Sequence, residues 1–326
     1  MIRPIALVVA SAALATAAAA VVAQTTPAAY PAKNVRMVVP WAPGGSTDVL
    51  ARILAQEMTK TLGHTFIVEN RPGASGNIGS DVVAKAAPDG YTILVGSMST
   101  HAMNGALFQR MPFKPVDDFS PVAMLGYVTN VLAAHPSVKA NSVRELIAQA
   151  RANPGRMTYA SAGVGSTNHL SAELFLRMAK IEMIHVPYKG GAPAVTDLVS
   201  GQVNIFFTGS TNVLEHTKSG RLKLLAVTEA QRAKILPDLA TVAETLAGYE
   251  LTVWYGVFLP AGAPADVVAK LNGECNRIMA LPEVRKRLEA LGVEIIARTP
   301  AEFGQILRAD TERWTRVIRD VGIKAD

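Results

Sequence analysis

Short apolar segments alternate with amphipathic helical segments along most of this chain, and this alternation strongly limits its possible folds. The apolar run at 35–40 precedes a segment, 47–62, whose apolar residues recur with helical spacing, and the runs at 65–70 and 91–97 continue the series. Strands that alternate with helices build α/β domains in which a sheet packs between helices. We therefore expect an α/β protein with parallel, doubly wound sheets flanked by helices.

A second series of the same kind occupies the middle of the chain. A strand pattern at 157–163 leads into a helical pattern at 165–180, and further alternations follow. No linker rich in proline, glycine or serine separates the two series, so we expect strands to cross between two domains near 125–132 and 222–228. The predicted domains are residues 30–125 together with 228–326, and residues 126–227, with a ligand cleft between them.

The first 23 residues have the pattern of a secretory signal peptide. Arg3 supplies a positive charge, an apolar, alanine-rich run follows from Ile5 to Val22, and small residues precede Gln24. We therefore expect export and cleavage after about Ala23. A retained membrane anchor is the alternative, but alanine is a weak span former and no basic cluster follows the run. No cysteine lies near the cleavage position, which excludes lipid attachment there.

Composition narrows the possible functions. The formal net charge is +6, and the basic residues are scattered along the chain. This distribution argues against nucleic-acid binding, although a mild positive field would attract small anions. The single cysteine, Cys275, lies in a helical pattern, and we expect a buried structural thiol.

Two similar glycine-rich loops each end a strand pattern and begin a helical one. The first reads GSTD from Gly45 to Asp48, and the second reads GSTN from Gly165 to Asn168. A helix start leaves backbone N–H groups unpaired and carries a partial positive charge, so such a loop can bind an anion. Ordinary capped helix starts are the alternative. Two matching loops that face one cleft favour a shared ligand.

The energetics favour a carboxylate shared between both loops. Several charge-assisted hydrogen bonds can balance the desolvation of one ion, whereas the donors of one loop would not suffice. Asp48 then presents a conflict, because its carboxylate would repel a bound anion. We expect Asp48 to turn back and accept N–H groups of its own loop, which would fix the shape of the loop without touching the ligand.

The remaining candidates lie near the same loops. His169 could touch ligand or pack against its own helix, and Trp41 and Tyr188 could form an apolar wall or belong to the core. Polar residues after two further strands are expected to face the same cleft, namely Ser97, Thr100, Asn104, Thr208 and Ser210. The predicted ligand-binding set is Trp41, Gly44, Gly45, Ser46, Thr47, Asp48, Ser97, Thr100, Gly163, Gly165, Ser166, Thr167, Asn168, His169, Tyr188 and Thr208.

The sequence lacks motifs for nucleotide binding, catalysis and metal binding. The first loop has no P-loop lysine, and the glycines at 73–79 are not spaced as in a dinucleotide-binding loop, so we interpret 73–79 as a turn and helix start. The G-x-S-x-G, H-E-x-x-H and S-x-x-K constellations have no counterpart here. The histidines lack metal-ligand spacing. We therefore expect no enzyme, no cofactor and no metal.

Several segments are characteristic of one family. VVPWAPGGSTDVLAR, ENRPGASGNIGSDVVAKAAPDGYTIL, YASAGVGSTNHLSAELF and VPYKGGAPAVTDLVSGQV occur in order between Tyr30 and the C-terminus. They resemble the Bug-type receptors, the periplasmic substrate-binding proteins of tripartite tricarboxylate transporters. Asn204 stands where that family usually has Asp, and residues 237–250 lack a customary proline and glycine. Both departures lie away from the two loops.

The resemblance implies a two-domain periplasmic binding protein of type II, a Venus flytrap, that closes on a small carboxylate-bearing solute. It places the ligand-gripping loops at Trp41 to Asp48 and Ala162 to His169, and it implies delivery of the solute to inner-membrane transporter subunits. We expect a periplasmic monomer that performs no chemistry. Two alternatives stay open: a sensor that presents bound acid to a membrane kinase, and an exported enzyme that acts on a small organic acid.

Overall fold

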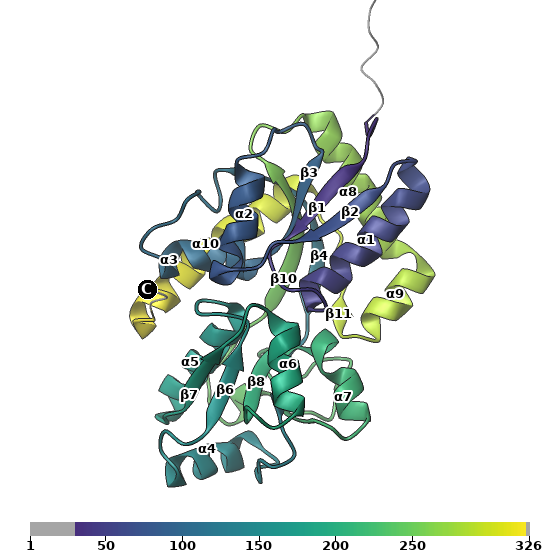
Figure 1. Ribbon diagram of the computed structural model, residues 1–326. Coiled ribbons are helices and arrows are strands. Elements are labelled where there is room, and N and C mark those ends of the chain that lie inside the picture. Colours follow the sequence, from purple (N-terminus) through teal and green to yellow (C-terminus); the bar gives the residue numbers. More distant parts are fainter. Residues whose placement is uncertain (1–29, 324–326) are drawn as a thin grey trace, which may run out of the picture.

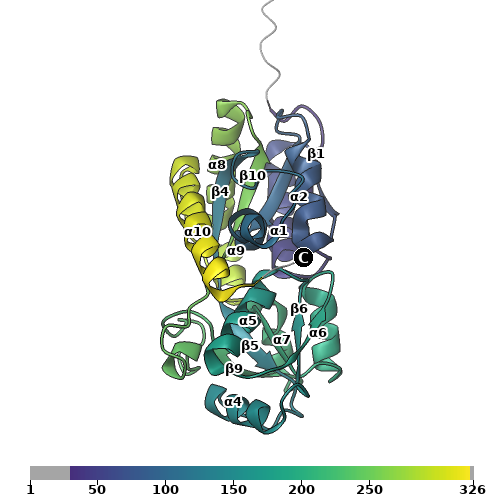
Figure 2. The same ribbon diagram turned by 90° about the vertical axis from the view of Figure 1, so that its left-hand side faces the viewer.

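The computed structural model describes residues 30–323, which form two α/β halves, one above the other in Figure 1. The upper half contains a six-stranded sheet and the lower half a five-stranded sheet. Helices flank both sheets, as the perpendicular view in Figure 2 also shows. The predicted signal peptide at 1–23 lies outside the described residues.

The larger sheet has the strand order β11-β4-β10-β3-β1-β2. Its strands are β1 (Val35–Val39), β2 (Phe66–Asn70), β3 (Thr92–Ser97), β4 (Phe119–Val128), β10 (Val253–Pro260) and β11 (Val293–Glu294). β1 lies between β2 and β3 and runs parallel to both. β1 is almost wholly buried, as expected for a strand covered on both faces.

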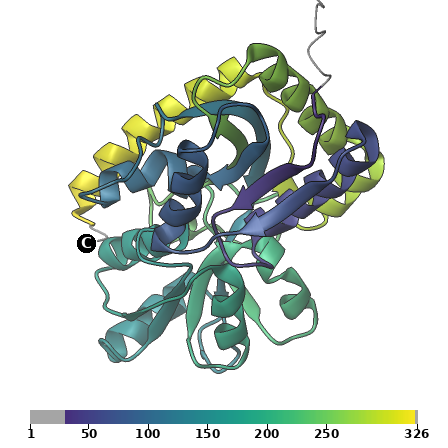
Figure 3. The same ribbon diagram turned by 45° about the horizontal axis from the view of Figure 1, so that its top comes forward.

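The helices of the larger half follow the predicted series closely. They are α1 (Ser46–Leu62), α2 (Asn77–Ala84), α3 (Asn104–Leu107), α8 (Ala265–Ala280), α9 (Pro282–Glu289) and α10 (Pro300–Val321), with a 3₁₀ turn at Ala74–Gly76 and a π-helix at Ser99–Met103. Helices α1 and α8 contact each other, and α10 contacts β4 and runs along one edge of this half (Figure 3). Cys275 on α8 is buried, as predicted, and burial raises the pKa of its thiol to about 12.

The smaller sheet has the strand order β7-β6-β8-β5-β9. Its strands are β5 (Asn130–Ala134), β6 (Thr158–Ser161), β7 (Ile184–Pro187), β8 (Ile205–Gly209) and β9 (Lys223–Val227). Its helices are α4 (Val143–Ala152), α5 (Thr167–Ala179), α6 (Gly191–Val199) and α7 (Leu214–Lys218), with 3₁₀ turns at Ser210–Asn212 and Val242–Glu244. One apolar cluster packs α4 and α5 against the sheet, and a separate cluster packs α6 against it. The sheet is therefore covered on both faces.

The expectation of purely parallel sheets is wrong. β10 runs antiparallel to β3 and β4, and β5 runs antiparallel to β8 and β9. These antiparallel pairs arise where the chain passes from one sheet to the other, because β4 is followed directly by β5, and β9 is followed by β10. The prediction of two α/β domains with doubly wound sheets is confirmed, but both sheets are mixed.

Backbone hydrogen bonds join the two connections between the sheets. The amide of Thr228 donates to the carbonyl of Asn130 (2.9 Å), and the amide of Leu251 donates to the carbonyl of Thr228 (2.9 Å). The amide of Thr129 donates to the carbonyl of Gly292 (2.8 Å). The crossing segments are therefore held side by side at the junction of the halves.

Candidate functional site at the junction of the two halves

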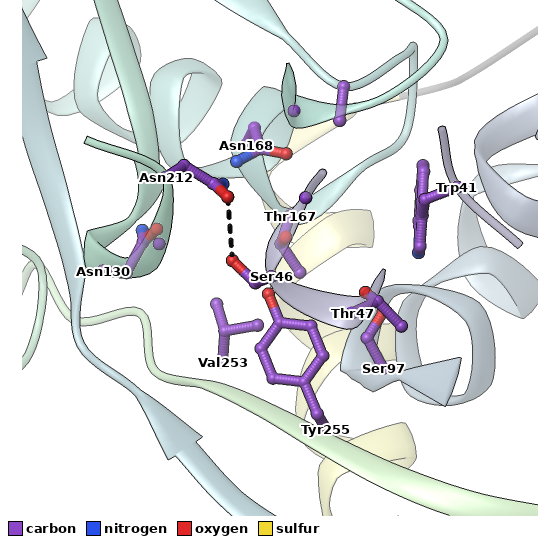
Figure 4. A pocket seen from close by; sticks show the side chains of 14 residues that line it. Trp41, Ser46, Thr47, Ser97, Asn130, Thr167, Asn168, Asn212, Val253 and Tyr255 are labelled. Atoms are coloured by element: carbon purple, nitrogen blue, oxygen red, sulfur yellow. Dashed lines mark hydrogen bonds between the residues drawn. The ribbon is translucent and has the colours of Figure 1, made fainter. Parts of the chain in front are cut away.

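A small cavity lies where the two halves meet (Figure 4). Its volume is about 40 Å³, which is room for about three water molecules. Its lining comes from both halves and comprises Trp41, Gly45, Ser46, Thr47, Ser97, Asn130, Ala162, Thr167, Asn168, Gly191, Gly209, Asn212, Val253 and Tyr255. None of these side chains is charged. We call this space the junction cavity.

The first loop presents unpaired backbone donors at the start of α1. Gly45 is the N-cap residue and provides no side-chain cap, so the amides of Ser46 and Thr47 have no acceptor among the described residues. Gly45, Ser46 and Thr47 all line the junction cavity. Donors of this kind carry the positive end of the helix dipole.

Asp48 stabilises the first loop through hydrogen bonds of its carboxylate. Its Oδ2 accepts from the amide of Gly44 (2.9 Å) and from Nε of Arg52 (2.8 Å), and its Oδ1 accepts from Nδ2 of Asn70 (2.9 Å). Burial would raise the pKa of Asp48, but the hydrogen bonds from Arg52, Gly44 and Asn70 outweigh it and lower the pKa. Asp48 therefore accepts a loop N–H as expected from the sequence, and it does not line the cavity.

The second loop is closed by different side chains at the start of α5. Oγ of Ser166 accepts from the amide of His169 (3.3 Å), and Nδ1 of His169 accepts from the amide of Gly165 (3.2 Å). The amides of Thr167 and Asn168 have no acceptor among the described residues, and both residues line the junction cavity. The two helix starts thus direct free donors at one space.

Direct contacts join the halves beside the cavity. Oγ of Ser46 lies 2.5 Å from Oγ1 of Thr211 and also donates to Oδ1 of Asn212 (3.4 Å; Figure 4). A Cβ at Gly209 would lie 2.7 Å from Oγ of Ser46, so a larger residue there would force the Ser46 side chain to shift. The amide of Ala42 donates to the carbonyl of Lys189 (3.3 Å). The halves are therefore in direct contact beside the cavity.

Strands that cross between the sheets complete the lining. Val253 and Tyr255 come from β10, and Asn130 is the first residue of β5. The hydroxyl of Tyr255 points toward Ser46 (Figure 4). Burial raises the pKa of Tyr255 to about 12, so its hydroxyl stays protonated and can donate.

Part of the predicted set meets in the cavity. Seven of the sixteen predicted residues line it: Trp41, Gly45, Ser46, Thr47, Ser97, Thr167 and Asn168. The other nine lie outside its lining: Gly44, Asp48, Thr100, Gly163, Gly165, Ser166, His169, Tyr188 and Thr208. Whether each residue contacts ligand stays a prediction.

Most of the nine hold neighbouring structure. Thr100 Oγ1 donates to the carbonyl of Ser97 (2.9 Å), and Thr208 Oγ1 accepts from Nδ2 of Asn212 (2.9 Å). The Tyr188 hydroxyl donates to Oδ2 of Asp197 (2.7 Å), and Tyr188 does not line the cavity. These side chains support the lining residues instead of joining them.

Two further polar residues expected at the cleft are also engaged elsewhere. Nδ2 of Asn104 donates to the carbonyl of Ser75 (2.9 Å), and Oγ of Ser210 donates to the carbonyl of Leu291 (2.6 Å). Both residues are close in sequence to residues that line the cavity, but neither lines the cavity itself.

Seven lining residues lie outside the predicted ligand-binding set: Asn130, Ala162, Gly191, Gly209, Asn212, Val253 and Tyr255. Asn130, Val253 and Tyr255 lie on strands that cross between the halves, and Gly191 and Asn212 lie at the start of α6 and after β8. Asn212 could have been predicted from its position after a strand, which is the reason why Thr208 was predicted. No local motif marks the crossing strands as cavity walls.

Neither a metal site nor a membrane span is found in the described part of the chain. Residues 30–323 contain no group of three His, Cys, Asp or Glu side chains placed to hold a metal ion. None of the helices in that range is both long and apolar enough to cross a membrane.

Two α/β domains around a polar junction cavity define the class of two-domain periplasmic binding proteins. Rpa4515 of R. palustris, solved with adipate, superposes with a TM-score of 0.88 at 36% identity, over 90% of this chain and 99% of that one. MatC from Rhodopseudomonas palustris, solved with bound malate, gives a TM-score of 0.85 at 34% identity, over 89% of this chain and 100% of that one.

The chain belongs to the tripartite tricarboxylate transporter family of receptors, whose family model matches residues 50–323. Protein BugT of Bordetella pertussis is 38% identical over 312 residues, which is 94% of this chain and 95% of BugT. The resemblance to Bug-type receptors is therefore confirmed. The family consists of solute-binding receptors, not enzymes.

Proposed function

We propose that this protein is an extracytoplasmic receptor that binds a small carboxylate-bearing solute in the junction cavity and performs no chemistry on it. The single observation that carries the proposal is the convergence of unpaired amides on one space. Ser46 and Thr47 supply them from α1, and Thr167 and Asn168 supply them from α5.

The magnitudes agree with this arrangement. A hydrogen bond to a charged group contributes about 1.5–3 kcal/mol, so the four amides together provide about 6–12 kcal/mol. Micromolar binding requires about 8 kcal/mol. The two amides of either loop provide about 3–6 kcal/mol, which falls short. Tight binding therefore needs both halves at once, and this requirement couples solute binding to closure.

The lining of the junction cavity also favours a negatively charged solute over a positively charged one. None of its side chains is an acid that could pair with a cationic solute. The hydroxyls of Ser46, Ser97 and Tyr255 can donate hydrogen bonds to an anion. An organic acid matches these donors, whereas an organic cation would be desolvated without a partner.

The size of the cavity implies that the halves move. A volume of about 40 Å³ is far below the 300–1,000 Å³ of common ligand pockets. The contact of Ser46 with Thr211 must therefore yield when a solute enters. Relatives with adipate and malate support acids with more than one carboxylate as the first to test.

The remaining parts of the proposal come from the family and the sequence. The domains are residues 30–125 with 228–326, and residues 126–227. The chain is exported to the periplasm after cleavage near Ala23, acts as a monomer, and delivers its solute to inner-membrane transporter subunits. The family match supports the location and the delivery.

The test is a thermal-shift panel of mono-, di- and tricarboxylates that includes succinate, malate and adipate. A ligand at 100 times its dissociation constant should stabilise the protein by about 2.7 kcal/mol. The matched control is 1,4-diaminobutane, which has the length of succinate but the opposite charge, and it should give no shift. Stabilisation by the diamine, or turnover of any acid, would contradict the proposal.

A further inference from the structure

Two histidines and a tyrosine form a stack directly behind the second loop. The ring of His185 on β7 lies between the rings of His169 and Tyr159, at centroid distances of 4.3 Å and 4.8 Å. The interplanar angles are 24° and 11°, so all three rings are nearly parallel. The lining of the junction cavity includes none of these three residues.

A hydrogen bond to the second loop fixes the tautomer of His169. The amide of Gly165 can only donate, so Nδ1 of His169 must carry a lone pair and the proton must reside on Nε2. Oγ of Ser161 accepts from the amide of Gly163 (3.1 Å) and lies 2.7 Å from Nε2 of His185. Either of these two atoms can donate in this contact, because a hydroxyl has two acceptor lone pairs, and the contact joins His185 to the loop.

Burial keeps both rings neutral. It lowers the pKa of His169 to about 4, and burial together with the neighbouring His169 lowers the pKa of His185 to about 4. The carboxylate of Glu173 lies beside the stack: its Oε1 accepts from the Tyr159 hydroxyl (2.6 Å) and lies 4.0 Å from Nε2 of His169. Arg177 in turn lies 4.0 Å from Glu173.

We propose that His169 is a positioning residue, a neutral imidazole acceptor that fixes the amide of Gly165 and thereby holds the free amides of Thr167 and Asn168 toward the junction cavity. Gly165 has φ +86, so its peptide is held in a conformation that few residues adopt, and the hydrogen bond from its amide defines the turn into α5. His185 supports this acceptor by stacking and by closing the Gly163 side of the loop through Ser161.

Asn and Leu have nearly the same shape, and this provides a matched pair of variants. In His169→Asn, the side-chain Oδ1 takes the place of Nδ1 and can accept from Gly165, whereas His169→Leu offers no acceptor. A residue that only fills space would tolerate both changes equally. A positioning residue requires that Asn rescues what Leu loses.

The first experiment needs no solute. Two-bond ¹H–¹⁵N correlation spectra of the full protein at pH 7 should show His169 as the Nε2–H tautomer. The Gly165 amide should keep its chemical shift in His169→Asn and change it in His169→Leu. A protonated His169, the opposite tautomer, or equal Gly165 shifts in both variants would overturn the proposal.

The second experiment rests on the proposed function and uses acetate as the probe. Acetate titration should shift the Thr167 and Asn168 amides in wild type and in His169→Asn, and the dissociation constant should rise about tenfold in His169→Leu. If acetate shifts neither amide in wild type although His169 is the Nε2–H tautomer, the receptor function fails and the positioning role stands. Equal affinity of all three proteins would overturn the positioning role.

Discussion

The two glycine loops share one hydrogen-bond pattern but use chemically different acceptors. In each, the side chain of a residue in the first helical turn accepts from the amide four positions earlier, from Gly44 to Asp48 in the first loop and from Gly165 to His169 in the second. The acceptor is a charged carboxylate in the first loop and a neutral imidazole in the second. Similar backbone geometry thus needs an acceptor at this position, but it does not specify the charge of that acceptor.

The difference has an electrostatic consequence. The carboxylate of Asp48 is neutralised by Arg52, 2.8 Å away, so the first loop carries no net charge toward the cavity. The imidazole of His169 has no such cation and remains neutral because it is buried. Both arrangements leave the helix dipoles as the main source of positive potential at the cavity.

The largest expected effect comes from Asp48→Asn. All three partners of the carboxylate are donors, so an amide NH₂ must face at least one of them, and Arg52 loses the negative charge of its partner. The free energy of unfolding should fall by about 3 kcal/mol, and solute affinity should fall with it. Urea denaturation measures the change, with the exposed Glu215→Gln as a control that should cost less than about 0.5 kcal/mol. An Asp48→Asn protein with unchanged affinity and stability would show that the first loop does not depend on the Asp48 carboxylate.

The second effect concerns pH and His169. The folded-state pKa is lowered from 6.5 to about 4, so the folded protein binds fewer protons than the unfolded chain between these values. Stability should therefore decrease as the pH falls from 6.5 to 4. His169→Asn and His169→Leu should both lose the part of this dependence that His169 contributes, on the order of 2–3 kcal/mol over that range, whereas His185, whose pKa is also lowered to about 4, keeps its own part. Unfolding curves at pH 7 and pH 4.5 measure it, and a slope equal to that of wild type would be inconsistent with a buried neutral imidazole.

A smaller effect is expected from the helix caps. Ser166 caps α5 with its side chain, whereas Gly45 gives α1 no side-chain cap. Ser166→Ala should cost about 1 kcal/mol of stability, and Gly45→Ala should cost less through capping. Thermal unfolding of both variants compares the two loops directly. Equal losses would show that the capping hydrogen bond contributes little.

The smallest effect concerns closure. Ser46 contacts Thr211 across the junction, so Ser46→Ala should favour separation of the halves in the ligand-free protein by about 1 kcal/mol. Thr211→Val should have a similar effect, and the double variant should add little more, because both remove one interaction. Small-angle scattering of the ligand-free proteins measures the change. Fully additive effects would argue against this contact.

The loops were predictable because their signals are local. A strand pattern, a glycine turn and a helix start lie within a few residues, so Ser46 and Thr167 could be chosen from sequence. The direction of β10 could not be chosen in this way, because it depends on which strands it meets after a long connection. Tyr255 and Asn130 were missed for the same reason, since they reach the cavity only through the pairing of crossing strands.

The position of Tyr188 and Thr208 outside the cavity lining has a different cause. Both follow strands near the cavity, as predicted, but each side chain is bound by a partner within its own half, Asp197 for Tyr188 and Asn212 for Thr208. Sequence position fixes which end of a sheet a residue occupies. It does not determine which neighbouring group forms a hydrogen bond with the hydroxyl of that residue.

The most direct test of the account removes one backbone donor from the cavity. Proline is tolerated at the first position of a helix and has no N–H, and the extended backbone of Ser166 (ψ 160) can precede it. Thr167→Pro should therefore weaken binding of the most stabilising acid of the panel by about tenfold or more, while Thr167→Ala stays within about threefold. Ala265→Pro, at the exposed start of α8, controls for proline itself. If Thr167→Pro binds as tightly as Thr167→Ala, backbone amides do not hold the solute and the account is wrong.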